Sequence, residues 1–457
     1  MRDFARSESP AVQAQLDRLG RLSVPDGRLG LDTIRALLDR LGNPQRRLPP
    51  VFHVAGTNGK GSTCAFLRAM LEAEGYAVHV TTSPHLVRYN ERIRVAGKLI
   101  SDDRLAQLLT EVLDIGEDLN PSFFEVTIAA AFTEFARVPA DACVVEVGLG
   151  GRFDATNVLE PDVLAACGIA ALGIDHERFL LAPEEGVPTI PIARIAFEKA
   201  GIAKRGVPLV TLDYEDKAAE EIRRVAQMKD ARLFERRSAW FCEDYGYLHY
   251  EDQQATAEQI ADQIRKSGSE GYRVVANRTK ELKLPAPGIP GPHQYLNAGL
   301  AVAILRHQQK LSISEEAFSA GVKAARWPAR LQKLSYGPLT ALVGDDRIWL
   351  DGGHNPSAGQ ALADTFEFDF HLVMGMLANK DPSALINPLR ERLRSLTIVS
   401  VPGHDSHAAS AFGGDVASAD DVEQALKSLP DDGYPVLIAG SLYLAGEVLR
   451  LNDELPD

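Results

Sequence analysis

A glycine-rich segment that carries one lysine is the first part of the sequence whose residue types and spacing could do chemistry. It runs from Gly56 to Ser62, reads GTNGKGS, and follows the apolar run 51–55. Glycines let successive backbone N–H groups point at one anion, and the helix predicted to follow adds partial positive charge at its start. Lys60 can reach distal phosphates, and Ser62 can ligate Mg²⁺. The segment therefore predicts a nucleoside triphosphate site.

The spacing of this segment departs from the common phosphate-loop pattern G-x-x-x-x-G-K-[ST]. Two residues rather than four separate Gly56 from Gly59, and Gly61 stands between Lys60 and Ser62. A glycine turn that only joins a strand to a helix is the alternative interpretation of this segment alone. Other polar residues must decide between the two interpretations.

Several polar residues follow predicted strands further along the chain. Glu146 lies near the end of one predicted strand, and Asp175-His176 follows another. Open α/β sheets bind ligands at the carboxyl ends of their strands, so Glu146 is well placed to face a metal-bound phosphate. Taken singly, Asp175-His176 could be a hydrogen-bonded turn, and Lys199 could be a solvated lysine on a helix. All of these residues together in one chain are far less expected by chance than any one of them alone.

Strand and helix patterns alternate along the chain, which predicts an α/β fold with a mainly parallel, doubly wound sheet. After Arg330 the alternation begins afresh, so we expect two domains, at 1–328 and 329–457. The predicted strands are 51–55, 77–82, 142–147, 163–169, 341–343, 348–351, 371–374, 396–401 and 435–439. The main predicted helices are 11–22, 31–41, 102–113, 123–136 and 294–308, with a surface loop at 181–191 and a solvated helix or excursion in the polar tract 250–271.

Composition limits the classes of function. The 457 residues carry a net charge of −14, which argues against wholesale binding of nucleic acid or of an anionic membrane. The four cysteines have no C-x-x-C spacing, so neither a disulfide framework nor a zinc site is indicated. No apolar run of about 18 residues and no signal-like start occurs. We expect a cytoplasmic protein that is neither secreted nor membrane-spanning.

Taken together, the motifs resemble those of the folylpolyglutamate synthase and dihydrofolate synthase family, among the Mur-ligase-like amide ligases. They occur in family order over almost the whole chain. The matching segments are HVAGTNGKGS (53–62), TTSPHL (81–86), NERI (90–93), FFEVTIAAAF (123–132), VVEVGLGGRFDATN (144–157), GIDH (173–176), EKAGI (198–202), HQYLNA (293–298), WPARLQ (327–332), LDGGHNP (350–356) and MGMLANKD (374–381).

The resemblance implies a phosphate-loop, ATPase-like first domain, which also binds the pterin, and a smaller Rossmann-like second domain on the glutamate side. The ATP phosphates would be held by Gly59, Lys60, Gly61 and Ser62. Further nucleotide contacts would come from Asn297, Arg330 and Asp351. Two Mg²⁺ ions would be held with the help of Ser62, Ser83, Glu146 and His176.

The resemblance also implies roles close to the reacting groups. Lys199 matches a lysine that the family carbamylates, which requires a neutral amine and therefore a lowered pKa. His354 would lie near the reacting groups. The pterin pocket would be lined by Phe124, Glu125, Phe153, Asp154 and Ala155.

The implied reaction joins L-glutamate to dihydropteroate or to a reduced folate in an ATP-dependent amide ligation. An acceptor carboxylate would attack the γ-phosphate, and the amino group of glutamate would attack the resulting acyl phosphate. Two Mg²⁺ ions and Lys60 would offset the repulsion among anionic reactants. The expected partners are these small molecules only, and the family is usually monomeric.

Three departures from the family pattern stand out. The gap between His176 and Lys199 is longer than expected, residues 251–283 match no motif, and DGGHNP replaces the more usual D-x-A-H-N-P. Two alternatives stay open. A Mur-type ligase that extends a peptidoglycan precursor would share the phosphate loop and metal ligands, whereas a plain phosphate-loop ATPase would leave Glu146 and the second domain without a shared purpose.

Overall fold

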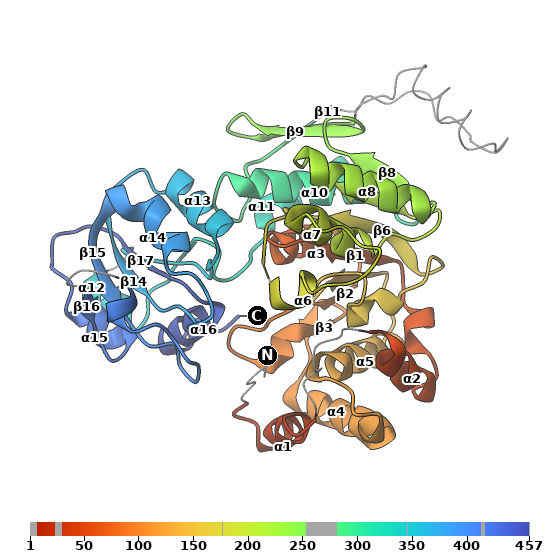
Figure 1. The fold of residues 1–457 in the computed structure, drawn as a ribbon, viewed down its shortest axis with the longest axis horizontal. Coiled ribbons are helices and arrows are strands. Elements are labelled where there is room, and N and C mark those ends of the chain that lie inside the picture. The colour runs from red at the N-terminus through yellow and green to blue at the C-terminus, as the bar shows by residue number, and fades with distance from the viewer. Residues whose placement is uncertain are drawn as a thin grey trace.

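The computed structural model describes residues 7–22, 30–175, 177–252, 281–344, 346–412 and 416–456. It has two α/β parts, and Figure 1 shows the C-terminal part, in blue, beside the larger N-terminal part. The larger part contains an eight-stranded sheet and a separate three-stranded sheet, and the smaller part contains a six-stranded sheet. The predicted α/β class is confirmed.

The eight-stranded sheet has the order β4-β3-β2-β5-β1-β6-β7-β8. Strands β2, β5, β1, β6, β7 and β8 pair in parallel, and β3 and β4 add an antiparallel edge. Their bounds are β1 Val51–Ala55, β2 Val78–Thr81, β3 Ile93–Val95, β4 Lys98–Leu99, β5 Ala142–Glu146, β6 Leu164–Ile169, β7 Pro208–Thr211 and β8 Arg232–Glu235. The predicted mainly parallel, doubly wound sheet is thus present.

Alternate residues of the central strands enter two different cores. In β1, Val51 and Ala55 pack in one core, whereas Phe52 and Val54 pack in the other. All five residues of β1 are buried, because helices cover both faces of the sheet. This two-sided burial explains why the strand reads as a continuous apolar run.

Two groups of helices cover the two faces of the sheet. The first core collects side chains from α1 Pro10–Leu19, α2 Asp32–Arg40, α4 Asp102–Gly116, α5 Phe123–Phe135, α7 Pro191–Ala200 and α8 Asp216–Met228. The second core collects those from α3 Lys60–Ala73, α10 His293–His307 and α11 Glu315–Ala324. The three-stranded sheet also packs in the second core, with β9 Trp240–Asp244, β10 Leu248–Asp252 and β11 Glu281–Leu284.

The six-stranded sheet has the order β12-β13-β17-β14-β15-β16 and is parallel except for β12. Its strands are β12 Gln332–Lys333, β13 Ile348–Leu350, β14 Phe370–Met374, β15 Leu393–Ile398, β16 Ala417–Ser418 and β17 Val436–Ala439. Its helices are α12 Thr340–Val343, α13 Pro356–Thr365, α14 Ser383–Leu389, α15 Val422–Lys427 and α16 Leu442–Leu451.

Two predictions of local structure did not hold as made. One is wrong, and the other concerns a tract that lies mostly outside the described residues. The predicted strand 341–343 is wrong, because these residues form α12. The side-chain oxygen of Asn452 accepts hydrogen bonds from the N–H groups of Leu339 and Thr340, which fixes the start of this helical turn. A run of only three apolar residues is too short to distinguish the periodicity of a strand from that of a helix. In the polar tract, residues 250–252 belong to β10, and the tract from 253 onward lies outside the described residues.

The connection after β6 contains the short helix α6 Glu177–Leu180 and then an irregular segment, 181–190, which leads into α7. The predicted loop is therefore present at this position. Within the described ranges, no helix is long and apolar enough to cross a membrane.

Candidate active site

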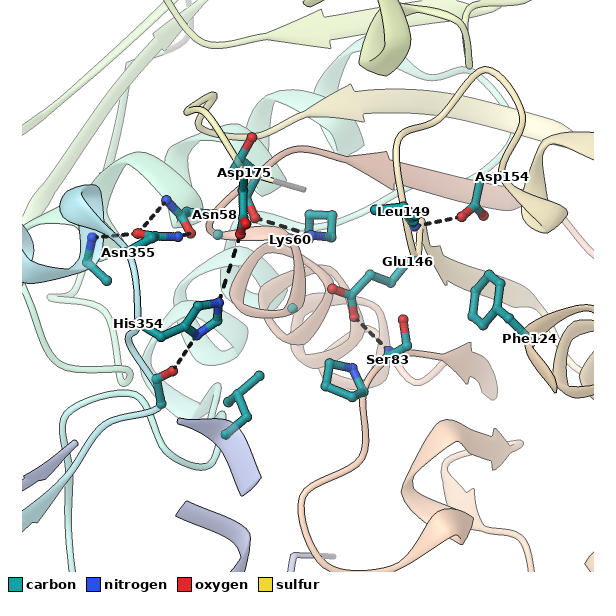
Figure 2. A pocket seen from close by; sticks show the side chains of 18 of the residues that line it. Asn58, Lys60, Ser83, Phe124, Glu146, Leu149, Asp154, Asp175, His354 and Asn355 are labelled. Carbon is teal, nitrogen blue, oxygen red and sulfur yellow. Dashed lines mark hydrogen bonds and ion pairs between the residues drawn. The ribbon is translucent and has the colours of Figure 1, made fainter. Parts of the chain in front are cut away.

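A cavity of about 940 Å³ lies where the carboxyl ends of the two parallel sheets face each other. Its walls include the loops that follow β1, β5 and β6 in the large sheet and β13, β14 and β17 in the small one. Parallel strands end at the same edge of a sheet, so residues far apart in the sequence meet here. Figure 2 shows the phosphate-loop side and the second-domain side in one view.

Most of the predicted site residues line this cavity. They are Gly59, Lys60, Gly61, Ser62, Ser83, Phe124, Glu125, Glu146, Phe153, Asp154, Ala155, Asn297, Arg330, Asp351 and His354. Lys199 is not on the wall, because it is buried behind it. His176 lies outside the described residues, so its predicted role as a metal ligand stays a prediction.

The phosphate loop is shaped by close packing that only glycine allows. Gly59 has φ 80°, and a Cβ on it would lie 2.3 Å from the Oδ1 atom of Asn297. A Cβ on Gly61 would lie 2.7 Å from the ring of Trp327. Helix α3 begins at Lys60, so its N-terminus faces the cavity. The unusual spacing therefore builds a loop-to-helix junction that suits an anion.

The residues beside the loop suit a hard, oxygen-liganded cation. The hydroxyl of Ser62 is buried without a hydrogen-bond partner, and Glu146 is almost fully buried. The N–H of Ser83 donates to the Oε2 atom of Glu146 over 3.1 Å. Burial raises the pKa of Glu146, and the Lys60 ammonium opposes this shift. A buried carboxylate beside an unsatisfied hydroxyl fits the oxygen ligands that Mg²⁺ prefers.

The described residues include no group of three or more His, Cys, Asp or Glu side chains that could hold a metal by themselves. A cation here therefore needs oxygen ligands from hydroxyl groups and phosphates as well as from Glu146. This donor set is typical of Mg²⁺ bound together with a nucleotide rather than in a closed protein cage.

Lys199 lies on α7 and is only 3% exposed. Burial and, to a smaller extent, the nearby Lys60 ammonium lower its pKa to about 7, against the opposing effect of Asp154, Asp175 and Glu198. The lowered pKa that the sequence predicted for Lys199 is therefore present, and much of the amine is neutral near pH 7.

The opposite end of the cavity is aromatic and holds one buried carboxylate. Asp154 accepts hydrogen bonds from the N–H of Leu149 at 2.8 Å and from the hydroxyl of Thr156 at 2.5 Å. Burial raises the pKa of Asp154, and these hydrogen bonds oppose that shift. Phe124 packs on Gly148, where a Cβ would lie 2.5 Å from its ring. Figure 2 shows Phe124 and Asp154 at this end.

Glu125 has a structural partner of its own. Its carboxylate accepts from the N–H of Ser122 at 2.7 Å, and the Ser122 hydroxyl accepts from the N–H of Glu125 at 3.3 Å. This reciprocal pair caps the N-terminus of α5. Glu125 therefore holds the start of the helix that presents Phe124.

Contacts between the two domains cross the cavity and were missed by sequence reasoning. The Lys380 ammonium lies 2.6 Å from Asp175, and the Nε2 atom of His354 lies 3.9 Å from the same carboxylate. The Asn355 amide donates to the Oδ1 atom of Asn58, in the phosphate loop, over 2.9 Å. Figure 2 shows the Asn58–Asn355 and Asp175–His354 contacts. The sequence signal for Lys380 is its place in the matching segment MGMLANKD (374–381), to which no role was assigned.

His354 has a defined tautomer in this arrangement. Its Nδ1 atom lies 3.1 Å from the carbonyl oxygen of Gly352, which can only accept, so Nδ1 carries the proton. Burial and the Lys380 ammonium lower the pKa of His354. The neutral ring therefore presents the lone pair of Nε2 towards Asp175 and the cavity.

The fold and the cavity define a two-domain nucleotide-binding protein of the Mur-ligase-like type. No family model matches the chain. A dihydrofolate synthase/folylpolyglutamate synthase of Bacillus subtilis is 33% identical to it over 446 residues, covering 92% of this chain and 94% of the relative. The chain belongs to the dihydrofolate synthase/folylpolyglutamate synthase family.

Two solved structures have the same fold over nearly the whole chain. The Escherichia coli FolC protein in complex with DHPP and ADP has a TM-score of 0.79 and 29% identity, covering 98% of both chains. A bifunctional folylpolyglutamate synthase/dihydrofolate synthase with Mn, AMPPNP and L-glutamate bound has a TM-score of 0.77 and 30% identity, covering 97% of this chain and 98% of the other.

Proposed function

We propose that this chain joins L-glutamate to dihydropteroate, to reduced folate polyglutamates, or to both, and cleaves ATP to ADP and phosphate. The observation that carries this proposal is the single cavity of about 940 Å³ that joins a phosphate loop, an aromatic pocket and the strand ends of the second domain. A volume of this size accommodates large ligands. The relatives' complexes with ADP, an ATP analogue, L-glutamate and DHPP support the same assignment.

The phosphate loop would bind the nucleotide through backbone N–H groups, and Lys60 would balance the charge of its distal phosphates. Ser62, Ser83 and Glu146, together with His176, would hold Mg²⁺. When bound, Mg²⁺ neutralises the charge of the phosphate oxygens during transfer. Asn297, Arg330 and Asp351, which line the same cavity, would contact the rest of the nucleotide.

The acceptor would lie with its pterin ring between Phe124 and Phe153, within reach of the buried Asp154 carboxylate. A carboxylate accepts hydrogen bonds from the amino and N–H groups on one edge of a pterin. This placement leaves the far end of the acceptor, with its carboxylate, towards the phosphate loop. Ala155 and Glu125 complete the predicted pocket wall.

The reaction would proceed in two steps. A carboxylate oxygen of the acceptor attacks the γ-phosphorus, the bond to ADP breaks, and an acyl phosphate forms. The neutral amino group of glutamate then attacks the carbonyl carbon, and phosphate leaves. His354 could take the released proton on Nε2, because its Nδ1 atom already donates to a backbone carbonyl.

The second domain would protect the acyl phosphate from water. Its loops meet the first domain at the Asn58–Asn355 and Asp175–Lys380 contacts, beside the phosphate loop. Closure around these contacts would exclude water from the activated carbonyl. Lys199 would support the metal site as a carbamate, for which its lowered pKa supplies the neutral amine.

We place the domain boundary between residues 328 and 329. Ala329 and Leu331 have positive φ values of 54° and 46°, which marks an irregular linker, and β12 begins the second sheet directly afterwards. A monomeric state, a cytoplasmic location and the absence of nucleic-acid partners stay predictions from the sequence.

The test is phosphate release by the purified chain with ATP and Mg²⁺. We expect release only when L-glutamate is present together with dihydropteroate or tetrahydrofolate. Comparison of the two acceptors identifies which activity the chain has. Steady release without acceptor or glutamate would instead indicate a plain ATPase, and release with a peptidoglycan precursor would indicate a Mur-type ligase.

A further inference from the structure

Four charged side chains form a closed ion-pair network beside the aromatic end of the cavity. Arg152 contacts Glu184 at 2.5 Å and Glu198 at 2.9 Å, and Arg194 contacts the same two carboxylates at 2.8 Å and 3.1 Å. The two positive and two negative charges balance. The side chains of Arg194 and Glu198 are 6% and 4% exposed, and those of Arg152 and Glu184 are 20% and 25% exposed, so one half of the network is buried and the other half is partly buried.

Three of the four members lie on parts of the molecule that backbone packing already holds together. The N–H of Arg152 donates to the carbonyl oxygen of Glu198 over 2.8 Å. A Cβ on Gly151 would lie 2.6 Å from that carbonyl oxygen, so the loop after β5 and helix α7 are in direct backbone contact. Glu198 and Arg194 are both on α7. The position of the loop after β5 relative to α7 therefore does not depend on Glu184.

Glu184 is the member that comes from the connecting segment 181–190. Its carboxylate accepts from both nitrogens at the end of the Arg152 guanidinium, at 2.9 and 2.5 Å. It also accepts from Arg194, whose Nε atom donates to the carbonyl oxygen of Leu180 over 3.1 Å. The two arginines hold the pKa of Glu184 down, at about 2, so it is ionised at neutral pH.

This segment forms part of the wall at the aromatic end. Phe179, on α6, lines the cavity. Leu180 packs on the loop after β5, because a Cβ on Gly150 would lie 3.0 Å from its side chain. The Arg152 guanidinium lies 4.2 Å from the ring centre of Phe153, which lines the same end of the cavity. Glu184 thus orients two arginines: Arg194 holds the carbonyl of Leu180, the residue next to Phe179, and Arg152 stacks on Phe153.

We propose that Glu184 is a positioning residue for the acceptor-binding end of the cavity. It acts through Arg152 and Arg194, which fasten the segment 177–190 against the pocket wall, and it has no contact with the phosphate loop. This inference rests on the proposed function, since it takes the aromatic end to bind the pterin acceptor. Its loss should weaken acceptor binding and leave nucleotide binding unchanged.

The test compares Glu184→Gln with Glu185→Gln, because Glu185 is the adjacent residue, has the same charge and is exposed. In Glu184→Gln the buried guanidinium of Arg194 and the partly buried one of Arg152 share the single carboxylate of Glu198. We expect the KM for the accepted pterin substrate, dihydropteroate or tetrahydrofolate, to rise about tenfold, as the loss of charged hydrogen bonds would produce. The KM for ATP should not change, and Glu185→Gln should match the unaltered protein.

The conservative variant Glu184→Asp keeps a negative charge between the two arginines. We expect it to recover most of the acceptor KM, which a merely structural role would not require. An unchanged acceptor KM in Glu184→Gln would contradict the proposal. A parallel rise in both KM values together with a lower Tm would also contradict it, since this result indicates general destabilisation.

Hydrogen exchange measured by mass spectrometry gives a readout that does not depend on activity. We expect faster exchange in peptides from 177–190 in Glu184→Gln, and unchanged exchange in Glu185→Gln. Unchanged exchange in both would overturn the fastening role. If the unaltered protein shows no pterin-dependent phosphate release, the proposed function fails, whereas the exchange measurement still tests the contact itself.

Discussion

The two sheets present different kinds of residue to the cavity that they share. The large-sheet side offers buried polar groups that lack a full set of protein partners, such as the Ser62 hydroxyl, and a buried carboxylate, Glu146. The small-sheet side offers Lys380 and Asn355, which are already paired with residues of the large domain. The polar groups named on the first side are free to receive ligands, whereas Lys380 and Asn355 on the second side hold the two domains together.

This difference predicts which substitutions remove chemistry and which only loosen docking. Groups on the large-sheet side should act on the phosphates and metal directly, so their loss should be severe. Lys380 and Asn355, on the small-sheet side, should act through the closed arrangement, so their loss should leave nucleotide binding intact.

The largest effect is expected from Lys60→Ala, on the large-sheet side. Removal of the ammonium should lower kcat by about 10³-fold or more, because Lys60 lies at the start of α3, where the distal phosphates would bind. Steady-state phosphate release measures this change. Lys229→Ala, which removes an exposed lysine at the end of α8, is the control and should have no effect. A kcat for Lys60→Ala within tenfold of the unaltered value would show that the loop is not catalytic.

Lys199→Ala should also lower kcat strongly, by about 10²-fold, if a carbamate at this position supports the metal site. Short carboxylic acids that fill the space could restore part of the activity. The carbamate needs the neutral amine, and the pKa of Lys199 is lowered to about 7. Its formation should therefore increase as the pH rises through 7 and decrease as the pH falls below it.

The fraction of Lys199 that carries a carbamate can be measured directly by ¹³C NMR with labelled bicarbonate. We expect a carbamate signal at pH 8 that weakens at pH 6 and is missing in Lys199→Ala. A signal that persists unchanged in Lys199→Ala would assign the carbamate to another amine. Equal occupancy at both pH values would contradict the lowered pKa.

On the small-sheet side, Lys380→Met should lower kcat by about tenfold to a hundredfold, because Asp175 loses its ion pair with Lys380 across the two domains. The affinity for ATP should stay the same, which isothermal titration calorimetry can measure. Lys380→Met combined with Asp175→Asn should cost less than the product of the two single changes. Strictly multiplicative effects would mean that the two residues act independently.

The smallest effect is expected from Asn355→Asp. The Asp side chain can still accept from the N–H of Ala358 and cap α13, but it no longer donates to Asn58. We expect an about fivefold decrease in kcat with an unchanged Tm, since one hydrogen bond is lost and the cap is kept. Asn387→Asp, on the exposed face of α14, is the control. A lower Tm would mean that the cap, rather than the contact with Asn58, was lost.

The sequence predicted features that depend on residues adjacent in the chain, and it missed features that depend on distant residues. Burial of β1 and the phosphate loop was predictable because the apolar run and the glycines are adjacent in the chain. Segment 341–343 was predicted wrongly as a strand, because its helical turn depends on Asn452, more than a hundred residues away. Glu125 was assigned to the pterin pocket, where it lines the wall, but its helix-capping contact with Ser122 was not foreseen.

The sequence by itself determined the fold class, the family and the segment that would bind phosphates. These follow from local spacing and from the order of motifs along the chain. The tertiary structure alone decided which residues face one another across the cavity. Asp175 and Lys380 are 205 residues apart, and Asn58 and Asn355 are 297 residues apart. Only the parallel strands of two sheets, which end at facing edges, bring such pairs within hydrogen-bond distance.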